Sequence, residues 1–124
     1  MSPRSAEFMT EAGERLLAAR ALLERQLLGA SVSDAYYASL YAARAALSER
    51  ERNAKTHGGT WHLFSEEYVA SGGFDADLAR EARALQEPRE GVDYAAARVR
   101  PEEAERIVGV AERFVAAVAA MLGG

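Results

Sequence analysis

The chain has 124 residues, of which 49% are hydrophobic and 27% are charged, enough to build one domain with a buried core. Its net charge of −4 argues against a protein that coats polyanions nonspecifically, and the absence of cysteine excludes disulfides and thiolate metal sites. No apolar run approaches the roughly 20 residues of a membrane span, and no signal peptide is visible. These features predict a cytoplasmic protein with a single domain over residues 1–124 and no contact with a membrane.

Residues 3 to 28 form the first predicted helix. Ser2 or Ser5 can cap it, Pro3 is acceptable in its first turn, and Gly29 is expected to end it. Apolar side chains recur along one face of this helix, while glutamates and arginines occupy the other. The apolar face consists of Phe8, Ala12, Leu16, Leu23 and Leu27.

Residues 33 to 47 form the predicted central helix, which has no glycine or proline and contains three of the five tyrosines. Ser33 can act as its N-cap, and Asp34 lies in the first turn, where a carboxylate complements the helix dipole. Apolar residues lie on two neighbouring faces, and no charge follows Asp34 before Arg44, which predicts a helix at the centre of a bundle. The side chains predicted to be buried there include Tyr37, Leu40 and Tyr41.

A polar loop follows the central helix and ends in Gly58 and Gly59, which separate it from a short helix. Thr60 is expected to cap this short helix, and the segment 71–73 to end it. Aromatic residues recur on one face of it, a pattern more typical of a packed core than of a platform for stacking nucleotides. These aromatic residues are Trp61, Phe64 and Tyr68.

Two further helices complete the chain. Asp75 begins the first of them, and Pro88 should kink or divide it just before Arg89. Pro101 marks the start of the last helix, which extends to the terminal glycines. Because no segment shows the alternating pattern of a strand, the sequence predicts an all-α fold. The predicted architecture is an antiparallel up-and-down bundle of four main helices plus a short helix.

Three segments carry a family resemblance: residues 34–47, the turn Lys55-Thr56-His57-Gly58, and Arg89 to Tyr94. In their order and separation they resemble the HEPN (higher eukaryote and prokaryote nucleotide-binding) superfamily, especially its small stand-alone prokaryotic members. The resemblance implies a homodimer that binds nucleotide or RNA. It also implies a two-component, toxin–antitoxin-like system in which a minimal nucleotidyltransferase is the partner.

Under this implied role, the candidate ligand-binding residues are Arg44, Arg89, Asp93 and Tyr94. Arg89 and Asp93 are one helical turn apart, so an ion pair inside the bundle competes with a phosphate-binding role. In the ribonucleases of the superfamily a histidine follows the arginine, but Asp93 and Tyr94 stand there in this chain. Neither is a general base near neutral pH, because aspartate is normally ionised and tyrosine normally protonated. The sequence therefore gives no support for RNA cleavage at this position.

Arg52 and His57 are the candidate catalytic pair of an alternative function, a metal-independent endoribonuclease. A neutral His57 can accept the proton of an RNA 2′-hydroxyl while Arg52 stabilises the phosphate. The competing interpretation gives His57 a structural role, capping backbone carbonyls where the chain enters the short helix. His62 faces another side of that helix, so no metal site and no cofactor are expected.

Overall fold

The described residues of the computed structural model are 1–95 and 98–123, without the side chains of residues 94 and 95. This part of the chain is helical and contains no strand, as predicted for an all-α fold. No helix in these two ranges is both long and apolar enough to cross a bilayer. The elements are α1 (Pro3–Glu24), α2 (Leu28–Glu49), α3 (His57–Phe64), a π-helical turn η1 (Ser65–Val69), α4 (Ala76–Ala84), α5 (Gln86–Ala95) and α6 (Pro101–Gly123).

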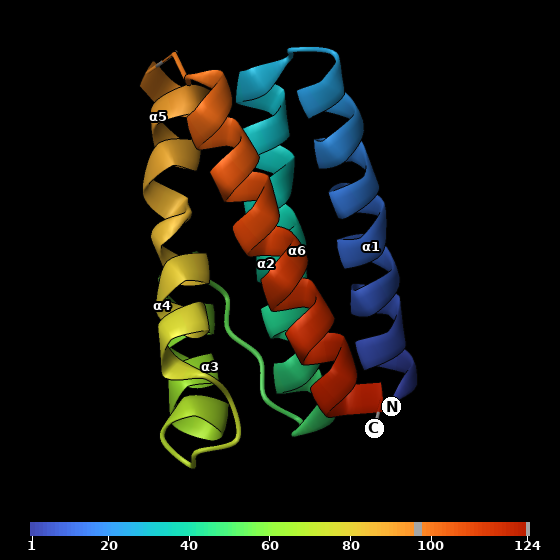
Figure 1. The fold of residues 1–124 in the computed structure, drawn as a ribbon. Helices are drawn as coiled ribbons and strands as arrows, with labels where there is room; N and C mark the ends of the chain where they lie inside the picture. The colour runs from blue at the N-terminus through green and yellow to red at the C-terminus, as the bar shows by residue number, and fades with distance from the viewer. Residues whose placement is uncertain (96–97, 124) are drawn as a thin grey trace.

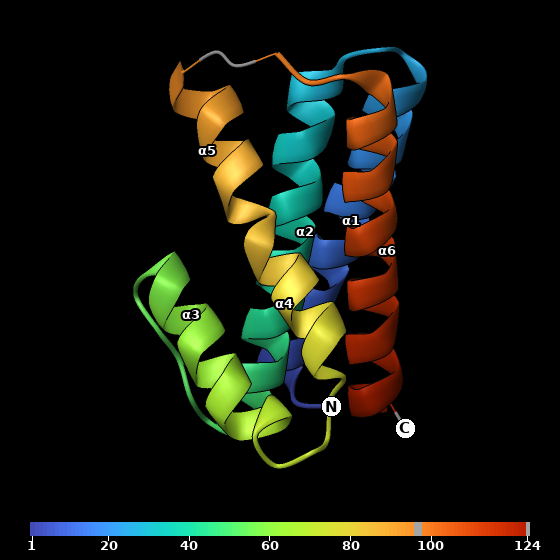
Figure 2. The same ribbon diagram turned by 60° about the vertical axis from the view of Figure 1, so that its left-hand side comes forward.

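The central helix is α2, which contacts α1, α3, α5 and α6. Figure 1 shows that α1 and α2 run in opposite directions, that α4 and α5 run back along α2, and that α6 returns beside α1 and α2. Figure 2 shows α3 as a short helix at one end of the molecule, where both termini also lie. The predicted bundle of four main helices plus a short one is confirmed, with α4 and α5 together forming one of the four.

Small side chains allow the neighbours of α2 to approach it closely. Two buried serines link it to α1: Ser5 donates its hydroxyl to the Ala45 carbonyl at 2.9 Å, and Ser31 donates to the Ala19 carbonyl at 2.7 Å. These bonds satisfy hydroxyl groups that have no access to water. The fully buried alanines of α2 are Ala35, Ala38, Ala42, Ala43, Ala45 and Ala46.

The tyrosines of α2 are arranged differently from the prediction. Leu40 is fully buried as expected, but Tyr37 and Tyr41 are only partly buried, and Tyr36 occupies the deep position instead. The Tyr36 hydroxyl accepts a hydrogen bond from the Trp61 indole nitrogen at 3.2 Å, which gives this buried polar group a partner. The burial predicted for Trp61, Phe64 and Tyr68 is confirmed.

The end of the first helix lies earlier than predicted. α1 ends at Glu24, and Gln26 adopts a left-handed conformation with φ of 62°, which reverses the chain before α2 begins. Leu27, predicted to lie on the core face of α1, is therefore outside that helix and 54% exposed. The prediction that Gly29 ends the helix is wrong because Gln26 takes that role.

α2 also begins earlier than predicted, at Leu28, because the chain has already reversed at Gln26. Gly29 and Ser33 both lie inside α2, so Ser33 is not its N-cap. A Cβ atom on Gly29 would lie 3.0 Å from a methyl group of Val92, so the glycine allows the close approach of α5.

The division near Pro88 is present but lies at Leu85, which places Pro88 in the first turn of α5, where its missing N–H is tolerated.

Candidate functional site

The turn between α2 and α3 fixes the position of His57. Thr56 is the N-cap of α3, because its hydroxyl accepts the Gly59 N–H at 2.9 Å, and the buried Thr60 donates its own hydroxyl to the Thr56 carbonyl at 2.9 Å. The prediction that Thr60 caps the helix is therefore wrong by one turn. A Cβ atom on Gly59 would lie 2.8 Å from the Thr56 hydroxyl oxygen, so glycine is needed there.

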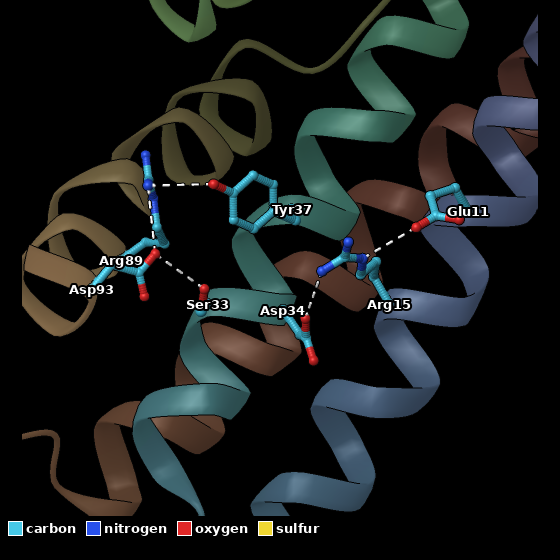
Figure 3. Close-up of polar contacts among 7 residues, drawn as sticks. All are labelled: Glu11, Arg15, Ser33, Asp34, Tyr37, Arg89 and Asp93. Atoms are coloured by element: carbon cyan, nitrogen blue, oxygen red, sulfur yellow. Dashed lines mark hydrogen bonds and ion pairs between the residues drawn. The ribbon is translucent and has the colours of Figure 1, made fainter.

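Arg89 of α5 is 3% exposed, and its side chain faces α2 and the first residue of α3, His57. One guanidinium nitrogen donates to the Tyr37 hydroxyl at 3.4 Å and lies 3.5 Å from the Asp93 carboxylate, as Figure 3 shows. The other lies 3.3 Å from Nδ1 of His57. Ser33 donates its hydroxyl to the same Asp93 oxygen at 3.3 Å. We call these five residues the Arg89 cluster; it joins α2, α3 and α5 through one buried charge.

The Arg89 cluster also determines the protonation of His57. A guanidinium group only donates hydrogen bonds, so the contact with Arg89 requires an unprotonated Nδ1 and places the ring proton on Nε2. Partial burial is the largest cause that lowers the pKa of His57 below its ordinary value of 6.5, and the positive charges of Arg89 and Arg44 lower it further. His57 is therefore neutral at neutral pH, and its basic lone pair is directed at Arg89.

Aromatic rings enclose the buried guanidinium. Its central carbon lies 5.1 Å from the centroid of Tyr36 and 5.4 Å from that of Tyr37. The rings of Tyr37 and His57 meet edge to face at 5.9 Å. Burial raises the pKa of Tyr36, so its hydroxyl is protonated and contributes no charge to the site. The ring contacts hold Arg89 in a packed environment.

The structure does not assemble Arg52 and His57 as a pair. Glu51, with φ of 57°, reverses the chain after α2, and Arg52 then binds the carboxylate of Glu67 in η1 at 2.6 Å. Arg50 binds the same carboxylate at 3.2 Å. The partner of the Arg52 guanidinium is thus Glu67, whereas His57 lies against Arg89. The arginine of the segment 89–94 therefore lies beside the histidine of the segment 52–57.

A groove of about 320 Å³ lies where the start of α1 meets the end of α2 and the loop that follows. Its described lining contains four cationic side chains and no carboxylate; an adjoining hollow shares part of this lining and adds Glu51. We call it the basic groove. It is lined by Arg4, Phe8, Arg44, Leu47, Ser48, Arg52, Asn53, Ala54 and Lys55.

The predicted ligand-binding residues divide between these two regions. Arg44 lines the basic groove, and its Nε donates to the Thr60 hydroxyl at 3.4 Å. Arg89 and Asp93 belong to the Arg89 cluster, whereas the side chain of Tyr94 lies outside the described residues.

Two lining residues, Arg4 and Phe8, were not predicted as part of a site. Their spacing of one helical turn is the available signal, and the Arg4 guanidinium does lie 4.6 Å from the Phe8 centroid. Sequence spacing does not show which loop this face of α1 meets, because that contact depends on the folding of distant segments.

The second histidine takes part in neither region. His62 pairs with Glu66 at 3.0 Å, and both side chains are more than half exposed. No group of three histidine, cysteine, aspartate or glutamate side chains within residues 1–95 and 98–123 is placed to hold a metal ion.

Comparisons with known proteins give a family and a fold. The chain matches the HEPN domain over residues 5–121. It is 32% identical over 117 residues to the UPF0332 protein glr0978 of Gloeobacter violaceus, a match that covers 93% of each chain. It is 35% identical over 104 residues to a candidate toxin of Methanocaldococcus jannaschii, MJ0605, covering 84% of this chain and 78% of the relative.

A second candidate toxin of the same archaeon, MJ0142, is 29% identical over 107 residues, covering 85% of this chain and 73% of the relative. Among solved structures, TT1696 from Thermus thermophilus matches with a TM-score of 0.81 at 18% identity. The match covers 97% of this chain and 99% of that one, and it shows a shared fold.

Proposed function

The chain belongs to the HEPN domain family, and from this premise we propose that it is the nucleotide- or RNA-binding member of a two-component, toxin–antitoxin-like system. Its role is to bind a phosphate-bearing ligand without cleaving it. Arg44, Arg52 and Lys55 supply the cationic contacts in the basic groove. The names of the two archaeal relatives support the toxin–antitoxin part of the proposal, and the groove supports the binding part.

The observation that carries the proposal is the charge distribution in the basic groove. Four cations and no carboxylate line it, although the whole chain has a net charge of −4. The Arg52 side chain is 46% exposed, and Glu67 fixes its orientation from one side. Arg4 also pairs with Glu7 at 3.5 Å, outside the groove lining, and guanidinium groups bind phosphate oxygens well.

The Arg89 cluster supports binding rather than catalysis. A general base needs a lone pair within reach of the proton that it removes, and the lone pair of neutral His57 faces Arg89 at 3.3 Å. We therefore assign Arg89 and Asp93 a supporting role, in which they hold His57 and α5 in place. The sequence-based prediction that Arg89, Asp93 or Tyr94 contacts the ligand directly is untested, and the supporting role is the one that we propose for Arg89 and Asp93.

A second candidate function is the metal-independent endoribonuclease. The observation that favours it is the approach of an arginine to a neutral histidine, which is the pair of groups that such a reaction needs. In this structure Arg89, and not Arg52, is the arginine beside His57. The reaction would require His57 to exchange its contact with Arg89 for one with an RNA 2′-hydroxyl.

Two protein partners belong to the proposal, and both come from the family resemblance. One is a second copy of the chain, and the other is a minimal nucleotidyltransferase that supplies the chemistry of the pair. Sedimentation across micromolar concentrations tests the homodimer. Copurification with a nucleotidyltransferase encoded by a neighbouring gene tests the second partner.

Binding titrations at several salt concentrations test the basic groove, with a short labelled RNA and with ATP as probes. Lys55→Gln removes one exposed groove cation, so it should weaken RNA binding and reduce the slope of log affinity against log salt by about 0.7 for each phosphate that is no longer neutralised. Arg113→Gln is the matched control, because Arg113 is 60% exposed, pairs with Glu81 and does not line the groove. Equal effects of the two variants, or no binding of either probe by the wild type, would contradict the proposal.

A further inference from the structure

One exposed face of α1 combines an apolar centre with acidic side chains. Leu17 is 75% exposed, the largest exposed fraction among the large apolar side chains of the described residues. Glu14 lies one turn before it on the same face and Glu24 two turns after it, with the exposed Ala21 between. Among the described residues, neither carboxylate has an ion-pair partner. We call these four residues the α1 ridge.

A hollow of about 230 Å³ lies on another part of the surface, between α4 and the segment formed by α3 and η1. Small and apolar side chains provide much of its lining, and two arginines of α4 provide its charge. We call it the α4 hollow. The apolar part of its lining consists of Trp61, Phe64, Val69, Ala76 and Ala79.

Arg80 and Arg83 line both the α4 hollow and an adjoining hollow of about 400 Å³, so they lie between the two. Arg80 binds Asp77 at 2.9 Å, but both side chains are more than 70% exposed, so this pair is weak and easily exchanged. Arg83 is exposed and has no ion-pair partner in the described part of the chain. Glu87 and Glu90 line only the adjoining hollow, so the described lining of the α4 hollow contains no carboxylate.

The α1 ridge and the α4 hollow are complementary in charge and shape. The ridge presents unpaired carboxylates around a leucine, whereas the hollow presents arginines beside an apolar space. Since an apolar cavity of about 150 Å³ can hold benzene, the hollow has room for a leucine side chain. Figure 1 shows α1 and α4 on opposite sides of α2 and α6, so the two surfaces can meet only between copies of the chain.

We propose that the α1 ridge of one copy docks in the α4 hollow of another, with Leu17 in the hollow and Glu14 paired with Arg83. This contact joins two different surfaces, so it continues from copy to copy into a ring or an open chain. A two-fold dimer instead pairs one surface with the same surface of its partner. The inference therefore goes beyond the proposed function, whose homodimer can close through a separate surface.

Sedimentation of the full chain from low to high micromolar concentrations tests the contact. The wild type should form species larger than a dimer as its concentration rises. Leu17→Arg places a cation in the cationic hollow, and Arg83→Glu places a carboxylate opposite Glu14, so each should weaken this association about tenfold or more. The matched controls Leu27→Arg and Arg106→Glu change exposed residues outside both surfaces and should associate like the wild type.

An equal mixture of Leu17→Arg and Arg83→Glu gives the sharpest test. The first variant keeps an intact α4 hollow, and the second keeps an intact α1 ridge. The mixture should therefore recover an association that neither variant shows alone, which a contact between identical surfaces cannot produce. A mixture that sediments as the sum of its two components would overturn the inference.

Thermal melts report whether the variants fold, and the wild type alone supplies a second test. Because the contact includes ion pairs, wild-type association should weaken as the salt concentration rises. A wild type that keeps one size at all concentrations, or whose association is insensitive to salt, overturns the inference. If Arg83→Glu loses association while Leu17→Arg keeps it, the hollow receives another surface and the inference is overturned as well. The RNA titrations of the basic groove test the proposed function separately, because the groove shares no residue with the ridge or the hollow.

Discussion

The basic groove and the Arg89 cluster both depend on arginine, but they place it in opposite environments. Arg89 is 3% exposed, and its guanidinium contacts a tyrosine, a histidine and an aspartate. The Arg52 side chain is 46% exposed and lines an open groove. A buried guanidinium that links three helices stabilises the fold, whereas an exposed one can reach a phosphate. Burial, more than sequence motif, therefore separates the arginine to which we assign a supporting role from those that we propose to bind ligand.

Removal of the buried guanidinium should be the most damaging change. Arg89→Ala should lower the free energy of unfolding by about 3–5 kcal/mol, because it opens a cavity and leaves Asp93 without its cation. Arg52→Ala, the groove counterpart, should cost at most about 1 kcal/mol, since an exposed ion pair contributes little. Denaturant unfolding measures both. A stable Arg89→Ala protein without RNA affinity would reverse the roles of the two regions.

The turn that joins the two regions gives a smaller effect with a matched control. Gly59→Ala should be less stable than Gly58→Ala by about 1 kcal/mol, because a methyl group on Gly59 collides with the capping hydroxyl of Thr56, whereas nothing lies within 4 Å of one on Gly58. Thermal melts measure the difference. Equal melting temperatures would show that the cap does not position His57.

The pH dependence of stability tests the state of His57. Its pKa in the folded protein is lowered by partial burial and by the charges of Arg89 and Arg44, so the folded state binds fewer protons than the unfolded state. Stability should therefore fall as the pH drops below 6.5 toward the folded pKa. His57→Gln removes this titration, so the difference between wild type and variant should depend on pH in that window. A constant difference would show that His57 is not held neutral by its neighbours.

RNA incubated with the protein should show no change at all. The purified protein in EDTA should leave a labelled RNA intact, because the basic lone pair of His57 faces Arg89. Gel analysis of the RNA over time measures this. Metal-free cleavage that disappears in His57→Ala would make the Arg89 cluster an active site and favour the ribonuclease function.

Local patterns in the sequence predicted much of the fold. The apolar faces of α2 identified the central helix. The spacing of Trp61 and Phe64 identified part of the hydrophobic core of the bundle. Asp75 and Pro101 marked helix starts correctly, because capping and proline effects act within a few residues. Gly29 misled the prediction, since its role is the close approach of α5, which is a contact between distant segments.

The candidate site was harder to predict for the same physical reason. Arg44 was selected, but Arg4 and Phe8 reach the groove only because α1 packs against α2. The contact between His57 and Arg89 joins residues that are 32 positions apart, so no short motif contains it. The pairing of Arg52 with Glu67 likewise depends on how η1 packs beside the loop.

The assignment of roles to the arginines can be read directly from their side-chain signals in proton–nitrogen NMR spectra during a titration with single-stranded RNA. Each guanidinium that meets a phosphate changes its environment, so its Nε–H signal shifts. We predict shifts for Arg44 and Arg52 in the basic groove and an unchanged signal for Arg89. A shift of the Arg89 signal with those of Arg44 and Arg52 unmoved would contradict these roles.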